Sequence, residues 1–200
     1  YLNQKIVDEA NTFGPFDKVV YYEKPLLKKT RQLYAGQWAD AFSYTEMPQW
    51  HLDHFKIKID EYVKHHDSHA AAGYFTSPFR EATILTVDAI GEWDTVSIST
   101  ADKVWIERKE TIKYPHSIGI LYSAFTHRCG LKPAEEEYIL MGMAAYGEPI
   151  YKDDIYEDFV HQAPFKMKKN LHRGLSDWHP EADVMDIAAS IQAVIEEILA

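Results

Sequence analysis

Two histidines four residues apart are the part of this sequence best suited to chemistry. His65 and His69 lie in the run VKHHDSHAAAGYF, and residues at positions i and i+4 share one face of a helix. Two imidazoles on one face can bind the same divalent ion. The same pair also fits a polar helix start that binds no metal, so the spacing alone leaves both interpretations open.

A carboxylate follows at the end of the next apolar run, ATILTVD. Asp88 closes this run and begins a turn made of Asp88, Ala89, Ile90 and Gly91. Acidic residues at the carboxyl ends of buried strands lie where α/β sheets usually bind ligands, although such a residue can also simply cap the turn. Two histidines and one carboxylate, without cysteine, suit Fe(II), Mn or Zn and leave coordination positions open for substrate oxygen.

Other residues fit a catalytic site less well. His51 and His54 are three apart, but neither a strand-end carboxylate nor a small-residue helix follows them. His66 lies off the face shared by the two predicted ligands, so a hydrogen-bonding or substrate-facing role and plain solvent exposure both stay open. Cys129 has no basic partner nearby in the sequence, and no Cys/His nucleophile can be argued.

The surrounding pattern predicts a mixed α/β fold. A helix should start at His65 or His66 and end before Ser77, because the residue preceding Pro78 resists the helical region. Before this helix we expect a short strand at 17–23, a helix after Pro25 up to Tyr34, and helix and loop over 35–62. After it we expect three consecutive strands at 82–88, 94–100 and 104–114.

The last third of the chain should be helical. Ser117 is a predicted N-cap for a helix that stops at Gly130 and carries Ile118, Leu121, Tyr122, Phe125 and Cys129 at helical spacing. We expect a short helix over 136–145, a polar connection over 148–182 and an amphipathic helix from Asp183 or Asp186. That final helix has no stop signal and the chain begins with Tyr1, so we expect an internal part of a longer protein.

Composition excludes several classes of protein. The chain has 200 residues, 46% apolar and 26% charged, which is ordinary for a folded domain. Its net charge of -10 argues against a surface that coats nucleic acid. No window approaches the roughly 20 apolar residues of a membrane span. The single cysteine excludes an internal disulfide and favours a reducing, cytoplasmic location.

Five motifs give the chain a recognisable pattern. They are HHDSHAAAGYFTSPF, LTVDAIGEW, YPHSIGILYSAFT, EEYILMGMAAYG and DIAASIQAVIEE, preceded by VVYYEKPLL. Their order and spacing resemble the O-carbamoyltransferases of the nodulation-factor and antibiotic-tailoring type. Those enzymes are related to the tRNA threonylcarbamoyl-transfer enzyme and to the hydrogenase-maturation carbamoyltransferase.

The resemblance implies a partial actin-like, ribonuclease-H-like duplicated fold. Residues 1–79 would form the end of the first lobe, including the metal-binding helix, and residues 80–200 would form the opening half of the second lobe. Members of the family continue into an adenosine-binding segment, a further aspartate ligand and an adenylate-forming domain. We therefore expect this chain to contain only part of the machinery.

The resemblance also assigns roles to residues. His65, His69 and Asp88 would be the metal ligands, with iron as the expected metal. The turn residues Asp88, Ala89, Ile90 and Gly91 would approach the nucleotide of a carbamoyl adenylate. The expected catalytic or pocket-lining residues are His66, Ser117 and Tyr122.

Four positions depart from the family pattern. The family has glycine where this chain has Ala89, and asparagine and glycine where it has Ala134 and Glu136. Ala145 replaces a common proline. Because the loop at 134–136 is the one expected to meet the acceptor, the identity of the acceptor does not transfer from the family.

The expected reaction is therefore carbamoyl transfer. Carbamoyl phosphate and ATP would give carbamoyl adenylate, and a hydroxyl of a sugar-containing metabolite or glycan would accept the carbamoyl group. We expect no nucleic-acid or membrane partner, while a homodimer is compatible with the sequence. Two alternatives remain at this point: a nonenzymatic nucleotide-binding or assembly module with an actin-like core, and tRNA threonylcarbamoyl transfer, which the acidic charge and PHSIGILYSAF disfavour.

Overall fold

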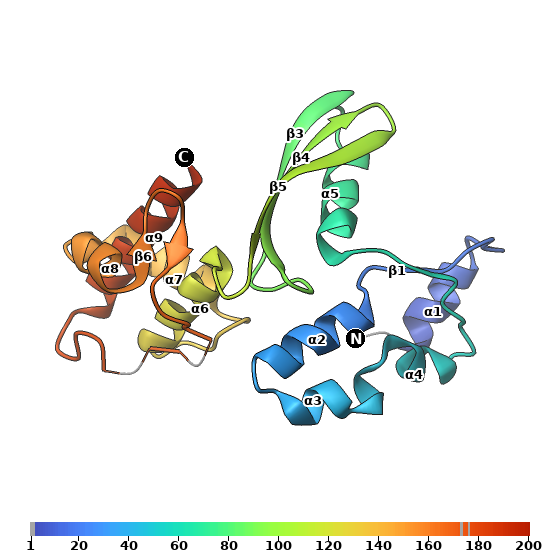
Figure 1. Cartoon of the computed structure of the whole chain (residues 1–200), viewed down its shortest axis with the longest axis horizontal. Helices are drawn as coiled ribbons and strands as arrows, with labels where there is room; N and C mark the ends of the chain where they lie inside the picture. Colours follow the sequence, from blue (N-terminus) through green and yellow to red (C-terminus); the bar gives the residue numbers. More distant parts are fainter. Residues whose placement is uncertain (1–2, 173, 176) are drawn as a thin grey trace. The chain divides into compact units, whose positions relative to one another are not determined.

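The computed structural model describes residues 3–172, 174–175 and 177–200. These residues form a mixed α/β structure that divides into two compact units (Figure 1). The first unit contains the described residues up to Ile84, together with Gly91–Trp93 and Thr100–Ile106. The second unit contains Leu85–Ile90, Asp94–Ser99 and the described residues from Glu107 to Ala200.

Each strand of a three-stranded sheet has residues in both units. Its strands are β3 (Glu81–Val87), β4 (Asp94–Asp102) and β5 (Trp105–Lys113), in the order β3-β4-β5. The short connections between consecutive strands require antiparallel pairing. The backbone N–H of Asp88 donates to the carbonyl of Thr95 at 2.9 Å, and that of Lys103 donates to Arg80 at 2.8 Å. The predicted three-strand meander is confirmed.

Short elements make up the first unit before the sheet. They are α1 (Gln4–Asn11), β1 (Val20–Tyr21), α2 (Pro25–Tyr34), α3 (Trp38–Phe42), η1 (Tyr44–Glu46), α4 (Pro48–Asp53), β2 (Glu61–Tyr62) and α5 (His65–Phe75). The helix predicted after Pro25 is confirmed, whereas the strand predicted over 17–23 is only two residues long. Strands β1 and β2 pair in parallel, with Val20 opposite Glu61 and Tyr21 opposite Tyr62.

Helix α5 is anchored at its carboxyl end. The Tyr74 side chain is buried, with 4% exposure. Its hydroxyl donates to the carbonyl of Arg80 at 2.6 Å and lies 3.3 Å from the carbonyl of Lys103. This places α5 beside the end of the sheet that belongs to the first unit (Figure 1). The helix ends at Phe75, as predicted from Pro78.

The second unit packs its helices around α9 (Val184–Leu199). Helices α6 (Ile118–Arg128), α7 (Glu137–Met143) and α8 (Lys152–Phe159), with the short turn η2 (Ala144–Tyr146), all contact α9 (Figure 1). The residues at the centre of this packing have 0% exposure: Leu121, Phe125, Leu140, Ile155, Ile187, Ile191 and Val194. Burial of such apolar side chains is the main stabilising contribution of this unit.

The prediction of a polar connection over 148–182 was wrong for part of that range. It contains α8 and a small antiparallel pair, β6 (Val160–His161) with β7 (Lys166–Met167). Ile155 and Phe159 are four residues apart, so they share a face of α8, and both are buried. Two apolar residues among several charged ones were too few to predict a helix from the sequence.

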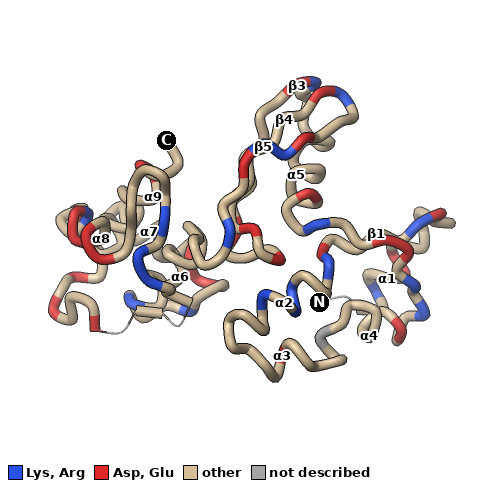
Figure 2. The backbone as a smooth tube through the Cα atoms, in the orientation of Figure 1, with Lys and Arg blue, Asp and Glu red and all other residues tan. Residues whose placement is uncertain are grey.

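Charged residues of both signs are distributed along the chain. Figure 2 shows basic and acidic positions interspersed. The sequence of α1, for example, contains Lys5, Asp8 and Glu9. Within the described residues, none of the helices combines the length and hydropathy needed to cross a membrane. The actin-like duplication and the two-lobe division at residue 80 stay predictions.

Candidate metal centre

Helix α5 positions the two predicted histidine ligands at its start. The Nε2 atoms of His65 and His69 lie 3.0 Å apart, and the ring centroids lie 4.7 Å apart. Two nitrogens that each bind one ion at about 2.0–2.1 Å lie roughly 3 Å from each other. The separation in α5 therefore fits two ligands that share an ion.

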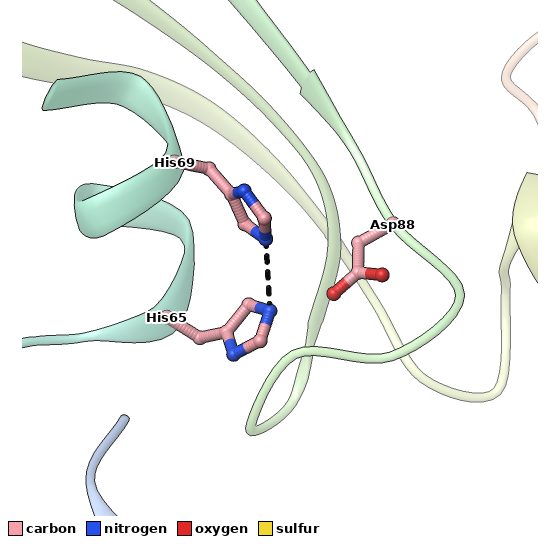
Figure 3. A group of neighbouring side chains, drawn as sticks. All are labelled: His65, His69 and Asp88. Atoms are coloured by element: carbon pink, nitrogen blue, oxygen red, sulfur yellow. Dashed lines mark hydrogen bonds between the residues drawn. The ribbon is translucent and has the colours of Figure 1, made fainter. Parts of the chain in front are cut away.

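Asp88 completes a group of three potential ligands. One ligand atom from each of His65, His69 and Asp88 lies within 4.8 Å of the others (Figure 3). Figure 3 shows both imidazoles projecting from α5 and the Asp88 carboxylate at the turn that follows β3. Two imidazoles and a carboxylate are a donor set that Fe(II), Mn and Zn accept. The residues fit a divalent metal, and metal binding itself stays a prediction.

A further carboxylate, that of Glu23, lies next to the Nδ1 side of the His65 ring. The Nδ1 atom of His65 lies 3.7 Å from Oε2 of Glu23, and Lys28 Nζ lies 3.3 Å from Oε1 of the same carboxylate. Burial by itself would raise the pKa of Glu23, but the interactions with His65 and Lys28 outweigh burial and lower the pKa below its ordinary value. Glu23 is therefore an ionised carboxylate at neutral pH.

The turn that carries Asp88 is held by the start of α6. The backbone N–H of Ala89 donates to Oδ1 of Asp88 at 2.7 Å. Ser117 Oγ donates to the carbonyl of Ala89 at 2.6 Å and accepts from the N–H of Ile120 at 3.0 Å. The predicted N-cap is confirmed. Ser117, at 0% exposure, thus joins the helix to the turn.

Gly119 permits this close contact. A Cβ atom built on Gly119 would lie 2.6 Å from the Cα of Ala89 and 2.7 Å from its nitrogen. Such distances are shorter than any side chain tolerates, so only glycine fits without movement of the turn. Sequence reasoning missed both Gly119 and Glu23. The one available signal for Gly119 was a glycine two residues after a helix cap, where helix formers are usual.

The three predicted catalytic residues have different surroundings. His66 is 1% exposed, which rules out plain solvent exposure, and its ring centroid lies 6.2 Å from that of His65. The Tyr122 hydroxyl donates to Oε1 of Gln192 at 2.9 Å, and burial raises the pKa of Tyr122 to about 12. Tyr122 is therefore a neutral phenol at physiological pH. The catalytic roles of His66, Ser117 and Tyr122 stay predictions.

The nucleotide-contacting roles of the turn also stay predictions. Ala89 is exposed, Ile90 is half-buried and Gly91 is buried. Cys129 is half-buried at the carboxyl-terminal cap of α6. Burial raises the pKa of its thiol to about 11, so the thiol stays protonated and is a poor nucleophile.

Comparison with known proteins decides the family. Residues 23–200 match the family model described as Carbamoyltransferase N-terminus. The chain belongs to the carbamoyltransferase family. The matched range includes α5, the turn after β3 and every predicted ligand.

Relatives of this carbamoyltransferase chain come from bacteria and archaea. It is 34% identical to the uncharacterized protein sll1178 of Synechocystis sp., over 92% of this chain and 37% of that protein. It is 30% identical to the uncharacterized protein MJ1058 of Methanocaldococcus jannaschii, over 67% of this chain and 26% of that protein. Nodulation protein NolNO of Sinorhizobium fredii is 31% identical over 49% of this chain and 14% of NolNO. The chain thus spans well under half the length of these relatives.

Proposed function

We propose that the protein is a metal-dependent O-carbamoyltransferase. Carbamoyl phosphate, ATP and water give carbamoyl adenylate with release of phosphate and pyrophosphate. A hydroxyl of a sugar-containing metabolite then takes the carbamoyl group, loses its proton and releases AMP. The observation that carries this proposal is the match of residues 23–200 to the carbamoyltransferase family. The grouping of His65, His69 and Asp88 within 4.8 Å supports metal dependence.

In this proposal the three grouped side chains hold one divalent ion, Fe(II) first and Zn or Mn as alternatives. The ion supplies positive charge that orients the activated carbamoyl group and stabilises charge on its oxygen. His65 and His69 contribute neutral Nε2 atoms, and Asp88 contributes a carboxylate oxygen. Because three protein ligands leave positions open, substrate oxygen has room to approach.

The turn after β3 has a second role in the proposal. Its exposed part, Ala89, presents backbone to the nucleotide of the carbamoyl adenylate, with Ile90 and Gly91 completing the turn. Ser117 holds this turn through the 2.6 Å hydrogen bond to the carbonyl of Ala89. His66 and Tyr122 are proposed to line the donor or acceptor pocket. The neutral phenol of Tyr122 donates its one proton to Gln192, so its oxygen is left to accept a hydrogen bond from the substrate.

The fold and location proposed for the whole protein follow the family. Residues 1–79 and 80–200 belong to the first and second lobes of an actin-like fold, and the protein works in the cytoplasm. The chain covers 37% of the relative sll1178, so further residues of the active site, including another metal ligand, are expected elsewhere in the full-length protein.

Carbamoyl transfer by the full-length protein tests the proposal. The protein is incubated with ATP and radiolabelled carbamoyl phosphate, and transfer of label is measured to a panel of sugar-containing metabolites and glycans. We expect His65→Ala and His69→Ala each to lower both transfer and Fe(II) affinity by more than about 100-fold, since even indirect supports of a metal contribute roughly 10–100-fold.

His51 and His54 provide a matched control. They are also a closely spaced pair, both exposed, at the end of α4, and the double variant His51→Ala/His54→Ala should keep full transfer and metal binding. Full transfer by a metal-stripped His65→Ala/His69→Ala double variant would refute metal dependence. Transfer of label to tRNA instead of sugars would refute the proposed acceptor class.

A further inference from the structure

The two ring nitrogens of His65 face different partners. Its Nε2 lies 3.0 Å from Nε2 of His69, and its Nδ1 lies 3.7 Å from Oε2 of Glu23. One nitrogen of the ring is thus turned to the candidate metal centre and the other to a carboxylate. The side chains of His65 and Glu23 are 15% and 12% exposed, so water competes little for this contact.

We propose that Glu23 is a positioning residue for the metal centre, which holds His65 in the tautomer with the proton on Nδ1. This inference rests on the proposed function, because it assigns an outer carboxylate to the same site. A histidine that ligates metal through Nε2 commonly donates its Nδ1–H to a carboxylate, which fixes the ring and makes the ligand more basic. In the proposal these two atoms, 3.7 Å apart in this structure, come to hydrogen-bond length when the metal is bound.

The backbone around Glu23 is tied to the backbone around His65. Parallel pairing places Tyr21 opposite Tyr62, and the N–H of Val63 donates to the carbonyl of Tyr21 at 3.0 Å. Glu23 lies two residues after β1, and His65 lies three residues after β2. The ring of Tyr22 also packs edge-on against that of His65, with centroids 5.5 Å apart. The segments that carry Glu23 and His65 are therefore held next to each other by backbone hydrogen bonds and by a ring contact.

Lys28 does not take Glu23 away from His65. Lys28 Nζ lies 3.3 Å from Oε1, whereas His65 Nδ1 lies near Oε2. The carboxylate can therefore serve both partners at once, one through each oxygen. Lys28, one turn into α2, restricts rotation of the carboxylate and keeps Oε2 directed at the ring.

Metal titration of full-length Glu23→Gln tests the proposal. Gln keeps the size of the side chain and removes its charge, so we expect Co(II) and Zn(II) affinities, measured against a competing chelator, to fall by about 10–100-fold. The matched control is Glu61→Gln. Glu61 is another carboxylate of the first unit, paired with Lys18 on the exposed surface of β2, and its loss should leave affinity unchanged.

Nitrogen-15 NMR of the histidine side chains gives a second readout, which a purely structural role would not predict. In the metal-free wild type, the neutral ring of His65 should already carry its proton on Nδ1, because the partner at Nδ1 and not a metal at Nε2 then sets the tautomer. This measurement decides the matter even if Glu23→Gln does not fold, because Nε2 protonation of the neutral His65 ring in the metal-free wild type would overturn the inference.

The outcomes separate this inference from the proposed function. If the wild type binds metal and Glu23→Gln binds it equally tightly, Glu23 is not a positioning residue while the metal centre stands. If the wild type takes up neither Co(II) nor Zn(II) nor Fe(II), the proposed metal centre fails, and the role of Glu23 fails with it. Weaker binding by folded Glu23→Gln, with Glu61→Gln unaffected, supports both.

Discussion

At the scale of single residues, the predicted ligands of the candidate centre are contacted by residues that are not ligands themselves. His65 has Glu23 next to its second ring nitrogen, and Asp88 receives a hydrogen bond from the N–H of Ala89 at 2.7 Å. Side chains supported in this way lose little conformational freedom when they bind a ligand, which favours binding. The support around Asp88 in turn depends on Gly119.

Gly119→Ala should disturb the Asp88 turn. The added Cβ would meet the Cα of Ala89 at 2.6 Å, so either the turn or the start of α6 must move. We expect a loss of about 1–3 kcal/mol in the free energy of unfolding, the usual cost of overpacking. Urea unfolding measures this loss, and a metal titration should show weaker binding in parallel.

Gly142 is the matched control for Gly119. It lies in α7, and a Cβ built there meets nothing within 4 Å. Gly142→Ala should therefore leave metal binding unchanged and stabilise the protein by roughly 0.4–1 kcal/mol, because alanine has fewer unfolded conformations than glycine. Equal stability changes in the two variants would show that the turn does not depend on close contact with α6.

At the scale of elements, His116 joins the segment before α6 to strand β7. Its Nδ1 accepts a hydrogen bond from the backbone N–H of Met167 at 3.1 Å, and its carbonyl accepts from Oγ1 of Thr95 at 2.5 Å. An accepting Nδ1 must be unprotonated. Burial, with a smaller effect of the charge of Lys166, lowers the pKa of His116 below its ordinary 6.5.

This lowered pKa predicts a pH dependence of stability. The unfolded chain binds the proton more readily than the folded one, so the contribution of neutral His116 is fully present above about pH 6.5 and is lost as the pH falls through the lowered pKa. Urea unfolding midpoints between pH 5 and pH 8 measure this. His116→Asn has an oxygen acceptor that does not titrate and should lack this component, and an unchanged pH profile in His116→Asn would contradict the assignment.

At the scale of the whole molecule, metal binding should stabilise the folded protein. A ligand that binds only the folded state adds about 2.7 kcal/mol at a concentration 100 times its dissociation constant. For a domain of this size each 1 kcal/mol raises the melting temperature by about 2–4 °C. Scanning calorimetry of the full-length protein with and without Fe(II), kept anaerobic, should show an increase that chelation reverses.

The same scan on His65→Ala/His69→Ala identifies the site responsible. The double variant should melt at one temperature with or without Fe(II), because the histidine ligands are gone. A metal-dependent increase that persists in this variant would place the stabilising ion elsewhere in the protein.

Local patterns determined much of what could be predicted. The i, i+4 spacing of His65 and His69, the cap at Ser117 and the alternation of the three strands are signals carried by residues within a few positions of one another. Those elements occur where they were predicted. The five ordered motifs were likewise sufficient to identify the carbamoyltransferase family.

Only the tertiary structure shows which other residues support the predicted metal ligands, because that support comes from residues far apart in the chain. The strands β1 and β2 are only two residues long and have no alternating pattern of their own. Their pairing nevertheless brings the segment of Glu23 next to the segment of His65. The need for glycine at Gly119 follows only from the backbone of Ala89, thirty residues away. Spacing along one helix was therefore sufficient to predict two metal ligands. The carboxylate next to His65 and the contact that holds the Asp88 turn could be identified only from the folded chain.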